Sequence, residues 1–152
     1  MCNDAEYSCG YSRWNTIREE IANAAVRYLQ TIYEEILQSN NDEDNAYIQT
    51  ELEKLIEYVD TNNCCTITDF GYLFIDKDFV NLFIQFDVGG VYALLNKSDY
   101  DGYYSVGNAV DIVKTFELVE THIVFDEVKS SLPYIKKVFE ESVRLGKMIH
   151  IC

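Results

Sequence analysis

The predicted fold depends on Phe79–Val88, which reads FVNLFIQFDV. Apolar side chains stand at every second position of this stretch, at Val80, Leu82, Ile84, Phe86 and Val88. A period of two is typical of a β-strand. The surrounding residues 64–96 are rich in Ile, Val, Phe, Tyr and Thr, which favour strands. We therefore expect an antiparallel meander here, with strands near 70–75, 79–88 and 91–95.

Two short polar or glycine-containing segments would connect these strands. Asp76-Lys77-Asp78 fits the turn before 79–88, and Gly89-Gly90 fits a tight turn or bulge after it. Cys64-Cys65 would begin the first strand. Neighbouring residues of a strand point to opposite faces, so we expect one of these two thiols to be buried.

Both flanks of the β region show a helical period instead. Residues 13–39 repeat apolar side chains at three- and four-residue steps, at Ile17, Ile21, Ala24, Tyr28, Ile32 and Ile36. A second apolar face runs through 45–60, at Ile48, Leu52, Leu55, Ile56 and Val59. The short acidic connection between these segments predicts an antiparallel helical hairpin over 13–60.

The C-terminal third predicts two more helices. Asn108 would cap a helix over 109–120, and His122–Asp126 would add a short strand. Ser130 or Ser131 would cap the last helix, in which Pro133 lies in the first turn and Gly146 stops the helix.

Together these patterns predict an α+β fold in a single domain, residues 1–152, with 1–12 as a candidate flexible end. It comprises an N-terminal helical hairpin (13–60), an antiparallel sheet of three to four strands (64–96), and a C-terminal region (108–152). The two C-terminal helices would pack on one face of the sheet.

Charge is the strongest functional signal. The chain carries 26 Asp and Glu against 12 Lys and Arg, a net charge of −14 with a pI near 4.3. Residues 34–60 hold nine acids and one base, a balance of −8, whereas 129–152 hold five bases and two acids, a balance of +3. The excess of acids argues against direct nucleic-acid binding, which depends on Lys and Arg.

The acidic segment contains a regular row of carboxylates. Glu53, Glu57 and Asp60 stand at i, i+4 and i+7 of the second helix, preceded by the loop cluster Asp42, Glu43 and Asp44. Helix neighbours at this spacing lie about 6 Å apart, comparable with successive phosphates of a DNA strand. We expect these six residues to bind a partner with a basic surface. The alternative is a solvated face that only keeps the protein soluble.

The loop Asn96–Ser105 supplies a second candidate surface. Tyr100, Tyr103 and Tyr104 could anchor a partner, because tyrosine is enriched at binding hot spots, or could pack over the sheet. The EF-hand pattern fails in this loop, because Lys97 takes the first ligand position and Asn108 the last; Asp99 and Asp101 remain an improvised calcium alternative.

Other chemistry finds little support in the chain. Cys2, Cys9, His150 and Cys152 match no zinc spacing, and five cysteines without a secretory context favour free thiols. A nucleophile mechanism would have only His122 and His150 as bases, and no family signature surrounds any Cys or Ser; phosphate-loop fingerprints are also absent. We expect no cofactor, no metal and no catalysis.

The interpretation is therefore an acidic inhibitor or interaction protein of the cytoplasm that binds a nuclease or a CRISPR or restriction effector by mimicking nucleic-acid phosphates. A phage or virus anti-CRISPR protein is the concrete form, and a bacterial immunity protein makes the same physical prediction. The alternative class is a viral or bacterial structural or adaptor protein that binds through its tyrosines and oligomerises. A homodimer stays open, and a small hydrolase ranks third.

Overall fold

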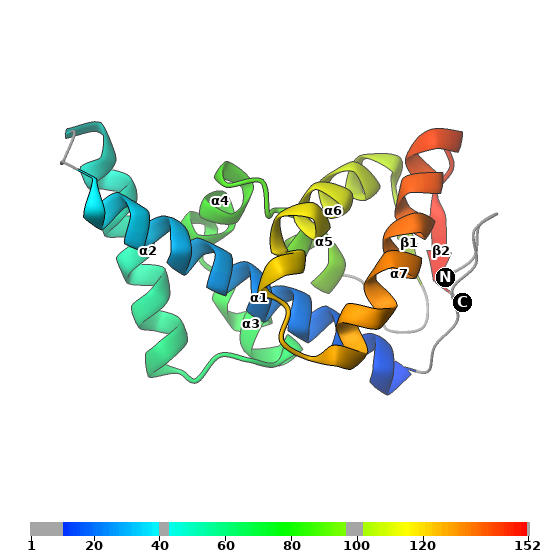
Figure 1. Cartoon of the computed structure of the whole chain (residues 1–152), viewed down its shortest axis with the longest axis horizontal. Helices are drawn as coiled ribbons and strands as arrows, with labels where there is room; N and C mark the ends of the chain where they lie inside the picture. Colours follow the sequence, from blue (N-terminus) through cyan, green and yellow to red (C-terminus); the bar gives the residue numbers. More distant parts are fainter. Residues whose placement is uncertain (1–10, 40–42, 97–101, 152) are drawn as a thin grey trace.

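The chain folds as an assembly of helices around α1. The structure is a computed structural model that describes residues 11–39, 43–96 and 102–151. Within these ranges the elements are α1 (Tyr11–Gln38), α2 (Glu43–Thr61), α3 (Ile67–Leu73), α4 (Lys77–Gln85), α5 (Gly90–Leu95), β1 (Gly102–Tyr104), α6 (Val106–Val119), the 3₁₀-helix η1 (Glu120–His122), α7 (Asp126–Leu145) and β2 (Ile149–Ile151). Figure 1 shows α1 crossing the molecule, with α2 at one end and α7 with the strand pair at the other.

The predicted α+β fold with a sheet of three to four strands is wrong. In the described ranges the only strands are β1 and β2, which pair antiparallel with Tyr103 opposite His150. Residues 64–96 form α3, α4 and α5 instead of a meander. The two C-terminal helices, α6 and α7, pack against each other and against α1, not against a sheet.

Burial explains why 79–88 is not a strand. Phe79, Leu82 and Phe83 are buried, at the spacing of a helix face, whereas Ile84 is 57% exposed. The helix begins where a turn was expected: a carboxylate oxygen of Asp76 accepts the backbone N–H of Asp78 at 2.9 Å and caps α4. A short apolar run fits both periods, so periodicity alone could not decide.

α3 also begins at a capping signal in the sequence. The Thr66 hydroxyl accepts the N–H of Asp69 at 3.2 Å, and the Asp69 carboxylate accepts the N–H groups of Cys65 and Thr66 at 3.1 and 3.0 Å. This is a capping box, and its hydrogen bonds hold the pKa of Asp69 below the usual value. Gly89-Gly90, expected as a hairpin turn or bulge, is the entry into α5.

The helical predictions at both ends are largely confirmed, with shifted boundaries at the C-terminal side. α1 and α2 occupy the predicted hairpin segments. α6 is capped by Ser105, and Asn108 is the third residue of that helix, where it completes a capping box. No strand forms over His122–Asp126, since η1 ends at His122 and α7 begins at Asp126.

α7 begins earlier than predicted because its first turn is acidic. Asp126 and Glu127 lie at the positive end of the helix dipole, which stabilises the helix start. Ser130 and Ser131 are therefore inside the helix and donate their hydroxyls to the Glu127 carbonyl, and Pro133 lies beyond the first turn. Gly146 ends the helix as predicted, in a left-handed conformation with φ of 64°.

α5 is short but is fixed at both ends. The Gly90 N–H donates to the Thr115 hydroxyl of α6 at 3.1 Å, and Gly90 lies so close to α6 that a Cβ there would meet the Asp111 carbonyl oxygen at 2.6 Å. At the other end, the Leu94 carbonyl accepts from Arg18 Nη1 and from the Tyr104 hydroxyl, both at 3.1 Å. This anchoring gives the surface around α5 a defined shape.

An ion pair within α1 places Arg27 for a hydrogen bond to η1. Arg27 Nη1 lies 2.7 Å from Glu20 Oε1 and donates to the His122 carbonyl oxygen at 2.6 Å. The Glu20 side chain is 1% exposed and that of Arg27 is 34% exposed.

Among the described residues, no helix is both long enough and apolar enough to cross a lipid bilayer.

Candidate functional site

The exposed side of α2 carries the predicted row of carboxylates. Glu53, Glu57 and Asp60 are all exposed, and the helix places them along one side at a spacing of about 6 Å. We call these three residues the acidic row. None of them forms a salt bridge or a side-chain hydrogen bond with another described residue.

Many carboxylates elsewhere in the chain have a structural partner. Glu51 pairs with Lys54 at 3.2 Å, Glu127 pairs with Arg13 at 3.2 Å, and Glu19 accepts the N–H of Ile67 at 3.1 Å. The acidic row differs from these residues because the fold makes no use of its charges.

The position of the acidic row is unfavourable for the helix itself. Glu57 and Asp60 lie toward the C-terminal, negative end of the α2 dipole, and the last turn of α2 contains no base. Like charges at i, i+4 cost a further few tenths of a kcal/mol. The row therefore does not contribute to folding stability.

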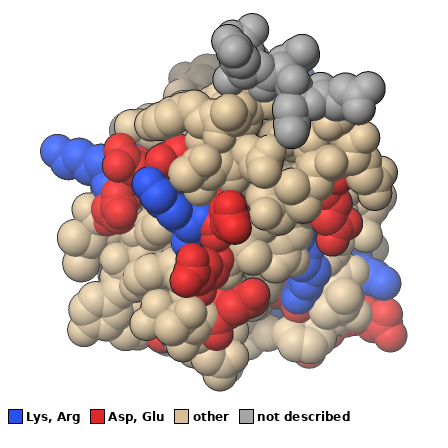
Figure 2. Space-filling model, turned by 90° about the vertical axis from the view of Figure 1, so that its left-hand side faces the viewer, with Lys and Arg blue, Asp and Glu red and all other residues tan. Residues whose placement is uncertain are grey.

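Acidic and basic side chains are more mixed in space than in the sequence. Figure 2 views the end of the molecule at which α2 lies; acidic side chains gather in groups there, and basic side chains lie among them. In the basic C-terminal segment, Lys136 lies 3.7 Å from Glu117 and Arg144 lies 2.5 Å from Glu141. The hydrogen bonds from Arg144 hold the pKa of Glu141 below its usual value.

The structure does not describe the rest of the predicted acidic face. Asp42 lies outside the described residues, and Glu43 and Asp44 begin α2 with side chains that also lie outside the described part. The acidic row is therefore the part of this prediction that the structure places.

The predicted tyrosines do not form one surface. Tyr103 is 52% exposed on β1, whereas Tyr104 is fully buried, with its ring 5.4 Å from that of Phe139 and its hydroxyl bound to Leu94. Tyr100 lies outside the described residues. Tyr104 is thus a core residue of the strand pair and is not available to a partner.

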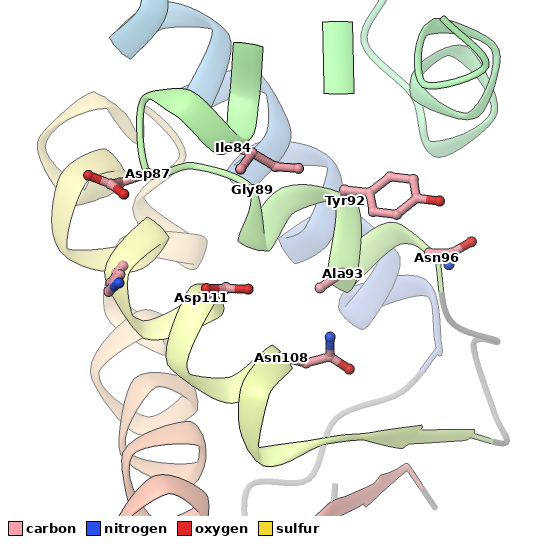
Figure 3. A pocket seen from close by; sticks show the side chains of 9 residues that line it. Ile84, Asp87, Gly89, Tyr92, Ala93, Asn96, Asn108 and Asp111 are labelled. Carbon is pink, nitrogen blue, oxygen red and sulfur yellow. The ribbon is translucent and has the colours of Figure 1, made fainter. Parts of the chain in front are cut away.

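Two adjoining hollows, which the sequence did not predict, lie on either side of α5. The first, a cavity of about 200 Å³, is lined by Ile84, Asp87, Gly89, Tyr92, Ala93, Asn96, Asn108, Asp111 and Lys114. Figure 3 shows the Asp111 side chain directed across the gap between α6 and α5, with Asp87 at the rim. The second, about 230 Å³, is lined by Gly71, Phe74, Ile75, Tyr92, Leu95 and Asn96.

The two hollows share Tyr92 and Asn96 in their linings, so they adjoin at α5, and together we call them the Tyr92 groove. Its lining comes from α3, α4, α5 and α6 and from the turns that follow the first three of these helices. Sequence reasoning assigned most of these residues to strands and turns, and no motif connects Asp87 with Asp111, so only the tertiary fold brings them together.

The carboxylate of Asp87, which lines the first hollow, acts on Tyr28 of α1. Burial, and then the carboxylates of Asp87 and Glu35, raise the pKa of Tyr28 above its ordinary value. The Tyr28 ring meets the His122 ring edge to face at 5.9 Å. His122, a candidate in the hydrolase alternative, is thus packed against a tyrosine.

Metal ligation gains no support from the described residues, among which no three His, Cys, Asp or Glu side chains are grouped to hold an ion. Asp99, Asp101 and the terminal cysteines Cys2, Cys9 and Cys152 lie outside the described residues, as does the side chain of His150.

The adjacent cysteines differ in environment, as predicted, although they precede a helix and not a strand. Cys64 is buried and Cys65 is exposed. Burial, followed by the nearby Asp69 carboxylate, raises the pKa of Cys64 to about 12.

Because the thiolate is the reactive species, we expect iodoacetamide at mildly alkaline pH to label Cys65 and to spare Cys64 in the folded protein. Tandem mass spectrometry measures labelling at each of the two cysteines. If Cys64 is labelled as fast in the folded protein as after unfolding in urea, the expected protection of Cys64 is contradicted.

No family model, curated protein sequence or solved structure matches this chain, so no relative's activity can be transferred to it.

Proposed function

We propose that this protein is an acidic interaction protein that binds the basic surface of a nucleic-acid-handling protein through the acidic row. The observation that carries the proposal is the row itself: Glu53, Glu57 and Asp60 are exposed and have no partner among the described residues. Their placement costs helix stability. A binding role explains why charges stand where folding does not favour them.

The partner class follows from the spacing and sign of these charges. Carboxylates about 6 Å apart along a helix present a linear array of negative charge to a groove built for a phosphate backbone. Such a complex would associate rapidly, and high salt would weaken it. Nucleases and CRISPR or restriction effectors have grooves of this kind, and a colicin-type DNase bound by an immunity protein presents the same physics.

The adaptor alternative has less support. It requires tyrosines that act together at the surface, and Tyr104 is buried while Tyr103 is exposed.

Reversing the acidic row tests the proposal. We expect Glu53→Lys, Glu57→Lys and Asp60→Lys together to leave the free energy of unfolding unchanged or to raise it by up to about 1 kcal/mol, because a base near a helix C-terminus is favourable. Inhibition of DNA binding should weaken by roughly 100-fold, near 1 kcal/mol for each lost charge contact. The measurement is competition with duplex DNA for a Cas9 complex, a restriction nuclease and a colicin-type DNase.

The matched control reverses three exposed acids on other elements, Glu34, Glu120 and Glu140. It changes the net charge equally and should retain inhibition. If both triple variants lose inhibition equally, net charge and not the acidic row is responsible. If the wild-type protein inhibits none of the three enzymes, the partner class is wrong.

A further inference from the structure

Four exposed large apolar side chains lie on α3, α4 and α5 or in the turn between α3 and α4. Tyr72 is 65% exposed, Ile75 74%, Ile84 57% and Tyr92 39%. Single exposed apolar residues are ordinary on a protein surface. Here Ile75, Ile84 and Tyr92 line adjoining hollows, an arrangement that is typical of an interaction site.

The central aromatic ring of the Tyr92 groove is held by the core. The Tyr92 ring meets the Phe74 ring edge to face at 5.5 Å, and Phe74 meets the fully buried Phe83 in the same way at 5.1 Å. Because its ring is already positioned, Tyr92 loses little conformational freedom when a ligand docks. A rigid, partly exposed tyrosine is a typical anchor of a protein interface.

The first hollow adds a negative charge next to this aromatic wall. Asp87 and Asp111 line it together with a single base, Lys114. Neither carboxylate forms a salt bridge with a described residue, and Figure 3 shows Asp111 pointing across the gap. The Oδ1 atom of Asn108 accepts the Ser105 N–H at 3.2 Å, which leaves its amide nitrogen for other contacts. This composition complements a cationic side chain.

The size of the hollows distinguishes a peptide from a cofactor. Small-molecule sites usually enclose about 300–1,000 Å³. The two hollows measure about 200 and 230 Å³. Each is therefore suited to one side chain, and their adjacency is suited to two neighbouring side chains of one segment.

From these features we propose that the Tyr92 groove docks a segment of a partner protein that carries Lys or Arg next to an aliphatic residue. The cationic side chain enters the hollow toward Asp111, and the aliphatic side chain packs between Ile75 and Tyr92. This surface, built from α3 to α6, is distinct from the acidic row on α2, so the inference does not depend on the function proposed above.

Titration with short synthetic peptides tests the inference, with the backbone amide signals of the full-length protein followed by NMR. The probe is a blocked peptide of alternating leucine and arginine. Its two counterparts replace arginine by glutamate, or leucine by serine. We expect saturable shifts centred on Gly71, Tyr92, Asn96 and Asp111 with the leucine–arginine peptide, and weaker binding of both counterparts. No saturable shifts at these amides, or equal binding of the glutamate peptide, would overturn the proposal.

Four variants locate the binding. Asp111→Asn and Tyr92→Ser should each weaken the leucine–arginine peptide about tenfold. Glu34→Gln and Tyr47→Ser, which change an exposed carboxylate on α1 and an exposed aromatic ring on α2, should leave its affinity unchanged. Amide spectra report whether each variant is folded. If Glu34→Gln weakens binding of the peptide as much as Asp111→Asn does, the peptide is bound by general charge and the groove assignment fails.

Sedimentation of the wild-type protein and Tyr92→Ser excludes a different occupant. We expect the two to have the same oligomeric state. If the wild-type protein self-associates and Tyr92→Ser does not, a second copy of the chain occupies the groove, and the proposal of a basic partner segment is overturned.

Discussion

Replacing Gly90 by alanine is expected to destabilise the protein by about 3 kcal/mol, because the new methyl group has no space. An ideal Cβ at this position would lie 2.5 Å from Thr115 Oγ1, 2.6 Å from the Asp111 carbonyl oxygen and 2.7 Å from the Ile112 Cα. Two of these atoms belong to the α6 backbone, so no change of rotamer relieves the overlap. α5 would have to move away from α6, which would lengthen the hydrogen bond from the Gly90 N–H to Thr115.

Thermal unfolding measures this effect, and a loss of about 3 kcal/mol corresponds to a fall in Tm of roughly 6–12 °C at this chain length. Gly71→Ala is the matched control. Gly71 lies in α3 with no atom within 4 Å of an added Cβ. Alanine favours a helix over glycine by up to about 1 kcal/mol, so this control should be neutral or more stable. Equal stability of the two variants would contradict the close approach of α5 to α6.

Arg27→Met is expected to destabilise the protein by a similar amount, because it leaves a buried carboxylate without its cation. Breaking a buried ion pair from one side typically costs about 3–5 kcal/mol. We expect about 3 kcal/mol, the lower end of that range, since Arg27 is partly exposed and water can reach the site. The His122 carbonyl would also lose the hydrogen bond from Arg27 that connects α1 to η1.

A double variant separates charge from packing. Glu20→Gln in the Arg27→Met background removes the uncompensated charge, so the double variant should be more stable than Arg27→Met alone in urea unfolding. Lys129→Met is the surface control: it removes a pair with Asp126 at 4.0 Å in which both side chains are exposed, and it should cost less than about 1 kcal/mol. A double variant less stable than Arg27→Met would show that lost packing, and not lost charge, dominates.

The sequence predicted the long helices and failed on the short ones for a physical reason. α1 and α2 repeat their apolar face over several turns, so the period is unambiguous. α4 spans 9 residues and α5 spans 6, too few for the helical period to outweigh the alternation in FVNLFIQFDV. The capping residues Thr66 and Asp76 were the available signals for α3 and α4.

The two candidate surfaces differ in the same way. The acidic row depends on one helix, so its spacing could be predicted from the residues alone. The Tyr92 groove depends on where α3, α5 and α6 meet, which follows from contacts such as Gly90 against α6 and Arg18 against Leu94. Tyr104, for which the sequence allowed either a surface anchor or a packed position, is buried in the strand pair that β1 forms with β2.

The central position of α1 matters most while the protein is being made. α1 emerges from the ribosome before the elements that cover it, which include α6, η1 and α7. Roughly 100 residues separate the end of α1 from the end of α7, and translation at about 5–20 residues per second takes about 5–20 s to add them. During that interval the cover over α1 is incomplete, although the finished protein buries residues such as Ile21, Ala24 and Leu29 completely. An incompletely covered α1 leaves apolar surface that is prone to aggregation until α6, η1 and α7 have been made.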